Sequence, residues 1–237
     1  VTSIELGSTG KIILYARWNP ISYSITYHNL NGTTHDNPSS YTIETPTIIL
    51  ASPTVRTGYN FLGWFTEASG GSKVTSIELG STEDMVFYAQ FEAKTYLITY
   101  DLDGGSGPTS LAVTYDEDFV LGTASKIGYT FAGWTYLDAP FTDGTWYFTT
   151  DITIKATYTR VTYHITYGNL QGTTHENPLS YTIETPTINL VSPTTRTGYD
   201  FAGWFTAITG GSKVTSIDLG STEDKNLYAQ WTPISYI

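Results

Sequence analysis

The stretch Gly58-Tyr-Asn-Phe-Leu-Gly-Trp64 returns as Gly128-Tyr-Thr-Phe-Ala-Gly-Trp134 and as Gly198-Tyr-Asp-Phe-Ala-Gly-Trp204. In each copy, the tyrosine and the phenylalanine alternate with smaller or polar residues. This period of two is that of a β-strand with one buried face. The stretch therefore predicts one β module that occurs three times in the chain.

The rest of the sequence repeats with the same spacing. Residues 21–92 and 161–232 are identical at 51 of 72 positions, and a shorter, divergent copy lies between them. A fixed period near ~70 residues predicts a tandem array. We divide the 237 residues into five parts. The end of a preceding repeat covers 1–19, and repeats one, two and three cover 20–92, 93–159 and 160–232. The start of a following repeat covers 233–237.

Within a repeat, the alternation predicts four strand regions. In repeat one they lie at 23–27, at 41–50 with an interruption at Pro46, at 59–63 and at 87–91. Asn31-Gly32 and Gly104-Gly105 are typical of turns between the first two strands. The best helical candidate is a single turn near 74–79. We therefore expect a β-rich fold, α+β at most.

Composition excludes several classes of protein. The chain has 22 acidic and 11 basic residues and no cysteine. It therefore lacks disulfides and thiolate chemistry, and an acidic protein is a poor binder of nucleic acid. No apolar run approaches the ~20 residues of a membrane span.

The repeated motifs resemble those of the Listeria–Bacteroides repeat, or internalin B B-repeat. The resemblance rests on Gly58–Trp64 with Gly70–Val74 and Tyr88–Phe91, and on the matching segments of repeat three. Repeat two lacks the Gly-Gly-Ser-Lys segment. The resemblance implies tandem modules of β-grasp, ubiquitin-like topology in extracellular bacterial surface proteins, and it supplies no catalytic residues.

The aromatic residues of the motif have two readings. They could form a surface that binds sugar or a protein partner, or they could fill the core of a small module, which needs large side chains. Their spacing beside glycines favours the core, whereas Tyr147 and Tyr163 cannot be placed. The structural signature consists of Gly58, Tyr59, Phe61, Gly63, Trp64, Gly128, Tyr129, Phe131, Gly133, Trp134, Gly198, Tyr199, Phe201, Gly203 and Trp204.

Metal-binding candidates are weak. Asp101-Leu-Asp103-Gly-Gly-Ser106-Gly107 resembles part of a calcium loop, but position twelve is Ala112 rather than glutamate, which favours a hairpin turn. We read 116–118 as a solvated acidic loop. The histidines do not have the pattern of a zinc site, so we expect His28, His35, His164 and His175 to be exposed in loops.

No catalytic motif occurs, so we expect no enzyme, catalytic residue, cofactor or metal site. Lys73 and Lys213 could form isopeptide crosslinks with Asn or Asp, and each crosslink to Asn would lower the intact mass by one ammonia. Asn31-Gly-Thr33 has the form of a glycosylation sequon, which we read as a turn.

The sequence thus favours a stalk or spacer of a bacterial surface protein, whose partners are its neighbouring repeats. The alternative is a module that binds a host protein or glycan. Short joins at 92–95 and 159–162 favour modules arranged end to end. Residues 1–19 contain one lone strand. We therefore expect them to be a disordered tail, to pair with a sheet edge such as the one at 233–237, or to begin a permuted repeat frame.

Overall fold

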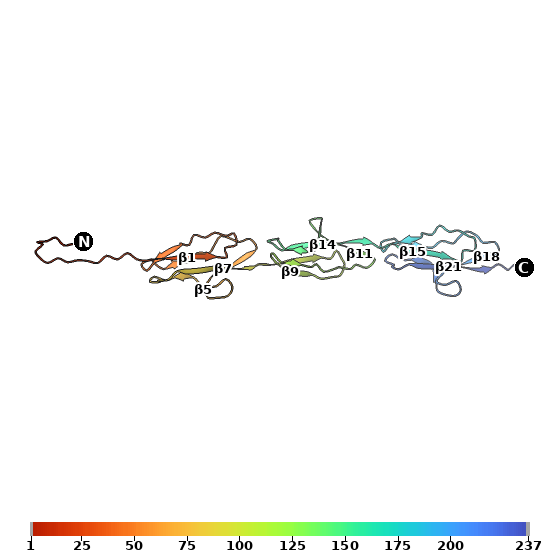
Figure 1. Cartoon of the computed structure of the whole chain (residues 1–237). Coiled ribbons are helices and arrows are strands. Elements are labelled where there is room, and N and C mark those ends of the chain that lie inside the picture. The colour runs from red at the N-terminus through yellow and green to blue at the C-terminus, as the bar shows by residue number, and fades with distance from the viewer. Residues whose placement is uncertain (1, 236–237) are drawn as a thin grey trace. The chain divides into compact units, whose positions relative to one another are not determined.

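The computed structural model describes residues 2–235, in which every regular element is a β-strand (Figure 1). The chain forms two compact units. One contains the residues up to Tyr96 together with Thr114–Glu117 and Thr145–Thr149; the other contains Leu97–Val113, Asp118–Gly144 and the residues from Thr150 onward.

Repeat one contains a five-stranded sheet in the order β2-β1-β7-β4-β5. The first and last strands are parallel neighbours at its centre, with Ile25 opposite Met85, and β4 runs antiparallel to β7. A separate pair, β3 with β6, completes the repeat. The strands are β1 (Ser22–His28), β2 (Ser40–Thr42), β3 (Ile48–Ile49), β4 (Tyr59–Phe65), β5 (Lys73–Val74), β6 (Ser76–Ile77) and β7 (Met85–Ala93).

Repeat three has the same topology, with sheets β16-β15-β21-β18-β19 and β17-β20. Its first and last strands are again parallel neighbours at the centre of the sheet. Its strands are β15 (Tyr163–Gly168), β16 (Ser180–Tyr181), β17 (Ile188–Asn189), β18 (Tyr199–Phe205), β19 (Lys213–Val214), β20 (Ser216–Ile217) and β21 (Lys225–Pro233).

Repeat two is a variant of this plan, with sheets β12-β11-β14-β8-β9 and β10-β13. Strand β8 runs parallel to β14, as the equivalent strands do in the other repeats. The strands are β8 (Thr95–Asp101), β9 (Ser110–Thr114), β10 (Asp118–Phe119), β11 (Tyr129–Tyr136), β12 (Ala139–Phe141), β13 (Gly144–Thr145) and β14 (Ile152–Arg160).

The predicted β-rich tandem repeats are confirmed, and the central parallel pair is the arrangement expected of a β-grasp sheet. The helical turn expected near 74–79 is wrong. Lys73–Val74 and Ser76–Ile77 form strands β5 and β6, because each pairs with another strand of its repeat. Across residues 2–235 the described fold contains no α-helix.

The signature tryptophans lie in the cores. Trp64 and Trp204 are each 2% exposed and Trp134 is 5% exposed. Each indole N–H donates to a backbone carbonyl at 2.7–2.9 Å. The acceptor is on Ala51 for Trp64, on Gly122 for Trp134 and on Val191 for Trp204. The ring fills the core while its polar edge is satisfied, as a buried tryptophan requires. Around Trp64 pack Ile25, Tyr41, Ile77, Phe87 and Ala89.

The segment before β1 remains outside every sheet. Residues 2–21 form no strand, and the side chains of Ile12, Leu14, Tyr15 and Trp18 are exposed. The described residues of this segment thus pair with no sheet edge, and a disordered tail stays a prediction. The suggested partner segment at 233–237 is described only as far as residue 235, and 236–237 lie outside the described residues.

Candidate functional site: a recurrent contact at the signature glycine

A preformed turn follows β16 in repeat three. The Thr185 N–H donates to the Thr182 carbonyl at 3.0 Å, and the Thr182 N–H donates to Oγ1 of Thr185 at 2.8 Å. These two bonds close a four-residue turn with Ile183 and Glu184 at its tip. The turn therefore presents an apolar side chain next to a carboxylate.

Gly128, the first residue of the repeat-two signature, receives Ile183. Its φ is +78°, and a Cβ built on it would lie 2.6 Å from Cβ of Ile183. Its carbonyl accepts the N–H of Val161 at 2.9 Å. Both the left-handed backbone and the missing Cβ are thus needed, which explains glycine at this position.

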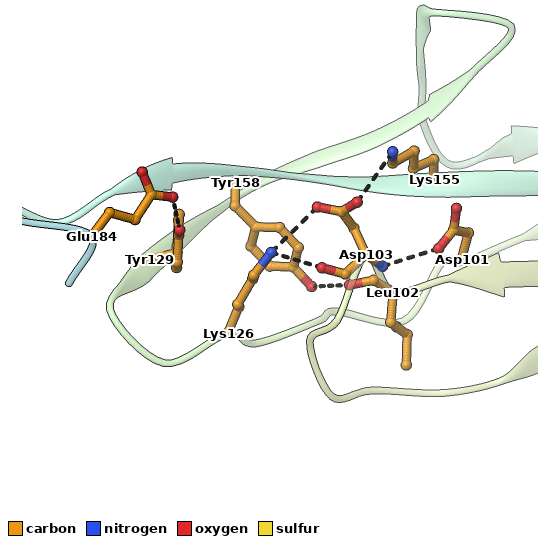
Figure 2. A network of polar contacts seen from close by, with 8 residues as sticks. All are labelled: Asp101, Leu102, Asp103, Lys126, Tyr129, Lys155, Tyr158 and Glu184. Atoms are coloured by element: carbon orange, nitrogen blue, oxygen red, sulfur yellow. Dashed lines mark hydrogen bonds and ion pairs between the residues drawn. The ribbon is translucent and has the colours of Figure 1, made fainter. Parts of the chain in front are cut away.

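The neighbouring tyrosine binds the carboxylate (Figure 2). The Tyr129 hydroxyl donates to Oε1 of Glu184. Nη1 of Arg160, which the figure does not draw, donates to Oε2 of the same carboxylate at 2.7 Å. The hydrogen bond to Glu184 is the main cause that raises the pKa of Tyr129, because ionising the phenol would place two negative charges together. The contact is therefore both apolar and ionic.

The same contact occurs in the other compact unit. Gly58 also has φ +78°, and a Cβ on it would lie 2.2 Å from Cγ of Tyr115. The Tyr59 hydroxyl donates to Oδ2 of Asp116 at 3.0 Å. Partial burial, and then this hydrogen bond, raise the pKa of Tyr59. An apolar residue followed by an acid thus meets a Gly-Tyr pair twice, although the residue types differ.

Lysines occupy the turn that resembles a calcium loop (Figure 2). Oδ1 of Asp103 lies 3.1 Å from Nζ of Lys155, and its Oδ2 lies 3.3 Å from Nζ of Lys126. Lys155 and Lys126, in that order, lower the pKa of Asp103. The Asp103 N–H donates to Oδ1 of Asp101 at 3.0 Å. These contacts correspond to the predicted hairpin turn.

Two histidine predictions were wrong. His35 and His175 are half-buried, with ring centroids 4.2 Å and 4.1 Å from Tyr27 and Tyr167 respectively. Each also meets the edge of a core tryptophan. Tertiary packing against the aromatic core overrides the polar character of these loops. His28 and His164 are exposed, as expected, but they lie in strands β1 and β15 rather than in loops.

The remaining signature residues lie where the strands place them. Tyr59, Tyr129 and Tyr199 are half-buried at the start of their strands rather than inside the core. The second glycine of the motif packs against a lysine side chain in repeats one and three. A Cβ built on Gly63 would lie 2.5 Å from Cε of Lys73, and one on Gly203 would lie 2.5 Å from Cε of Lys213. The reading of Asp116 as only a solvated acid was wrong, because it accepts the Tyr59 hydroxyl.

Comparison with known families identifies the modules. The model of the Listeria-Bacteroides repeat domain matches residues 23–90, 96–159 and 163–230. The chain belongs to the Listeria-Bacteroides repeat family. No solved structure matches these Listeria-Bacteroides repeats. Within the part of the chain that the structure describes, no helix is long and apolar enough to cross a membrane.

Two relatives show how such repeats occur in longer proteins. A protein of Evansella cellulosilytica named "Putative membrane protein" is 30% identical over 94% of this chain and 35% of its own length. Internalin H of Listeria monocytogenes is 36% identical over 47% of this chain and 22% of its own length. The chain thus spans about a third or less of these relatives.

Sequence reasoning missed the contact residues themselves. Tyr115, Ile183 and Glu184 were not singled out as candidates, and Asp116 was interpreted only as part of a solvated acidic loop. A signal was available, because the Listeria-Bacteroides repeats place an apolar residue and an acid at the same point, as Ile43-Glu44, Tyr115-Asp116 and Ile183-Glu184. Asp116 contacts Tyr59, 57 residues away in the chain, and Glu184 contacts Tyr129, 55 residues away. Contacts over such a separation leave no local pattern in the sequence.

Proposed function

We propose that the chain is a non-enzymatic stalk or spacer segment of a bacterial cell-surface protein, located outside the cell at its wall. It would project another domain and could add weak adhesion of its own. The observation that carries the proposal is the recurrent contact between a Gly-Tyr pair and an apolar–acid turn. A spacer has to hold successive modules in a defined order, and a contact built into the family signature serves that purpose.

Two further observations support this proposal. The joins between repeats are short and lack the Gly/Ser runs of flexible tethers. The chain carries a net charge of −11, and like charge limits self-association of an exposed protein. The region that matches this chain makes up 35% and 22% of the length of the two relatives, which leaves room in them for further domains that a spacer could project.

Small-angle scattering tests the stalk proposal. A compact particle of this length would have a radius of gyration of about 18 Å. Three modules in a line, each with a radius of gyration of about 11 Å and with centres roughly 30 Å apart, would together have a radius of gyration of about 27 Å. We expect the larger value. A radius near 18 Å would reject a spacer and favour a compact binding domain.

A second candidate function, binding of a host glycan or protein, is favoured by one feature. An open groove of about 680 Å³ lies beside the contact at Gly128, lined by Lys126, Tyr129, Ile183, Glu184 and Leu219 among others. Leu219 and the neighbouring Ile127 are 62% and 79% exposed. Aromatic and apolar side chains beside charged groups suit such ligands.

A glycan array and a cell-binding assay distinguish the two functions. If the chain is a binding module, it should bind saturably, and the double variant Lys126→Ala, Leu219→Ser should abolish that binding. A matched control is Leu79→Ser, at the equivalent exposed position of repeat one. A spacer without its own ligand gives no saturable binding in either assay.

A further inference from the structure

The chain enters and leaves each repeat at opposite ends of its central parallel pair. In repeat two, β8 begins at Thr95, with one residue between it and β7, and β14 ends at Arg160, with two residues between it and β15. Because β8 and β14 run in the same direction, tension along the chain pulls them past each other along the strand axis. Such a load shears the pair, so that its hydrogen bonds share the load and have to break together. A load across the strands would break the same bonds one at a time.

An aspartate lengthens this ladder in all three repeats. It stands immediately before the last strand, and its Oδ1 accepts a backbone N–H from the first strand. The donor is the residue just before the first backbone pair, so the carboxylate adds a rung where the ladder would otherwise end. The donor residue varies because only its backbone is used, whereas the acceptor is aspartate each time. The three bonds run from Ser24 to Asp84 at 2.6 Å, from Leu97 to Asp151 at 2.8 Å and from His164 to Asp224 at 2.7 Å.

The core protects the ladder on one side. The inward side chains of the paired strands are buried, as Ile98 and Ile154 are in repeat two and Ile165 and Leu227 are in repeat three. Strands β15 and β21 lie side by side over that core (Figure 1). Water therefore has little access from this side to replace hydrogen bonds that a load stretches, which raises the barrier to opening.

We propose that each parallel pair, together with its aspartate, is a mechanical clamp through which the chain bears tension. We name Asp84, Asp151 and Asp224 the latch aspartates. The hydrogen bond from the Ser24 backbone is the main cause that lowers the pKa of Asp84, so the latch is an ionised carboxylate at neutral pH. Ladder, latch and core all resist the one direction of load that a tether experiences.

The use of the clamp rests on the proposed stalk function, because a stalk that projects another domain is pulled along its length. The clamp itself is a property of each repeat and does not depend on the radius of gyration of the chain. A compact particle in small-angle scattering would reject the stalk and leave the clamp standing. Weak resistance to shear would reject the clamp and leave the stalk standing.

Single-molecule pulling of the whole chain tests the clamp in two directions. The chain has no cysteine, so two introduced cysteines provide the only thiol handles. Thr162→Cys with Thr232→Cys loads β15 against β21 in shear. Thr162→Cys with Glu223→Cys places both handles at the same end of the pair and peels it open. All three positions are exposed.

We expect the shear geometry to require a several-fold larger unfolding force than the peeling geometry at the same loading rate. Forced unfolding is governed by the barrier to unfolding, so the difference between the two directions reports the clamp rather than the equilibrium stability. Unfolding in shear should lengthen the tether by roughly 200 Å, at about 3.5 Å for each extended residue, which identifies the event as that of repeat three. Equal forces in the two directions would overturn the proposal.

Variants of the latch provide the second test. Asp224→Ala removes the carboxylate and should lower the unfolding force in shear, whereas Asp224→Asn retains an oxygen acceptor for the His164 N–H and should recover most of that force. The matched control is Glu176→Ala, which removes another exposed acid of repeat three and should leave the force unchanged. Circular dichroism establishes that each variant folds, and the comparison of directions keeps every latch intact and decides without them. A shear force that Asp224→Ala leaves unchanged would overturn the role of the latch.

Discussion

The Tyr129 hydroxyl donates a hydrogen bond to the carboxylate of Glu184, a residue 55 positions later in the chain. Tyr129 belongs to the signature of one repeat, and Glu184 belongs to a turn of the next. Arg160 holds the second carboxylate oxygen at 2.7 Å. A signature that reads as a core motif therefore has a second task at its first two positions, where it binds the following repeat.

Removing the charge of Glu184 should lower the pKa of Tyr129. Because the folded-state pKa of Tyr129 is raised, its contribution to stability is present below pH 10 and is lost as the pH rises further. In Glu184→Gln we expect the pKa of Tyr129 to fall toward 10, as measured by NMR titration of the ring carbons. The pKa of Tyr59, which is paired with Asp116, should not change. An unchanged Tyr129 pKa would contradict the ion-assisted contact.

Substituting alanine at Gly128 and at Gly198 should lower the free energy of unfolding by different amounts. Both positions have nearly the same φ, so both substitutions carry the backbone cost of a left-handed alanine, about 1–2 kcal/mol. Only at Gly128 does the new methyl group meet Ile183. We expect Gly128→Ala to destabilise the chain more than Gly198→Ala in denaturant unfolding. Equal losses of unfolding free energy would mean that Ile183 does not pack there.

The buried tryptophans should dominate the stability of their repeats. Trp204→Ala removes a ring that is 2% exposed, at an expected cost of roughly 3–5 kcal/mol, which approaches the whole stability of a small domain. Amide exchange should accelerate throughout 163–230. The matched control is Trp18→Ala, because Trp18 is 88% exposed and its loss should cost less than ~0.5 kcal/mol. Similar effects of the two substitutions would refute the core assignment.

Alkali should unfold the chain through two tyrosines. Burial raises the pKa of Tyr27 and of Tyr167 from 10 to about 12. Between pH 10 and 12 the unfolded phenols ionise while the folded ones remain neutral, so the free energy of unfolding should fall across this window. The double variant Tyr27→Phe, Tyr167→Phe should lose much of that dependence. A wild type and double variant with the same profile above pH 10 would contradict the assignment.

Much of the fold was predictable because its pattern is local. The alternation in 23–27 and 59–63 predicted strands. Asn31-Gly32 predicted a turn, and both residues have positive φ in a turn within the loop between β1 and β2. The parallel pairing of β1 with β7 joins residues about 60 apart, and only the family resemblance implied it.

The contact site was less predictable, for physical reasons. Ile183-Glu184 in a Thr-Ile-Glu-Thr turn reads as an ordinary exposed loop, and its role depends on a glycine in another repeat. His35 was misplaced for a similar reason, since only the folded chain brings Tyr27 and Trp64 around it. The best helical candidate, at 74–79, lacked a clear helical period, and strand pairing determines the structure of this segment instead.

The most direct test of the contact is a nuclear Overhauser effect between the δ1 methyl of Ile183 and the Hα protons of Gly128. That methyl carbon lies 2.6 Å from the would-be Cβ of Gly128, so we expect a strong cross-peak. Ile43 occupies the same turn in repeat one and is the internal reference. In dilute samples of a single chain, its methyl should show no cross-peak to Gly58, Gly128 or Gly198. A spectrum in which Ile183 resembles Ile43, with no cross-peak to Gly128, would contradict the account.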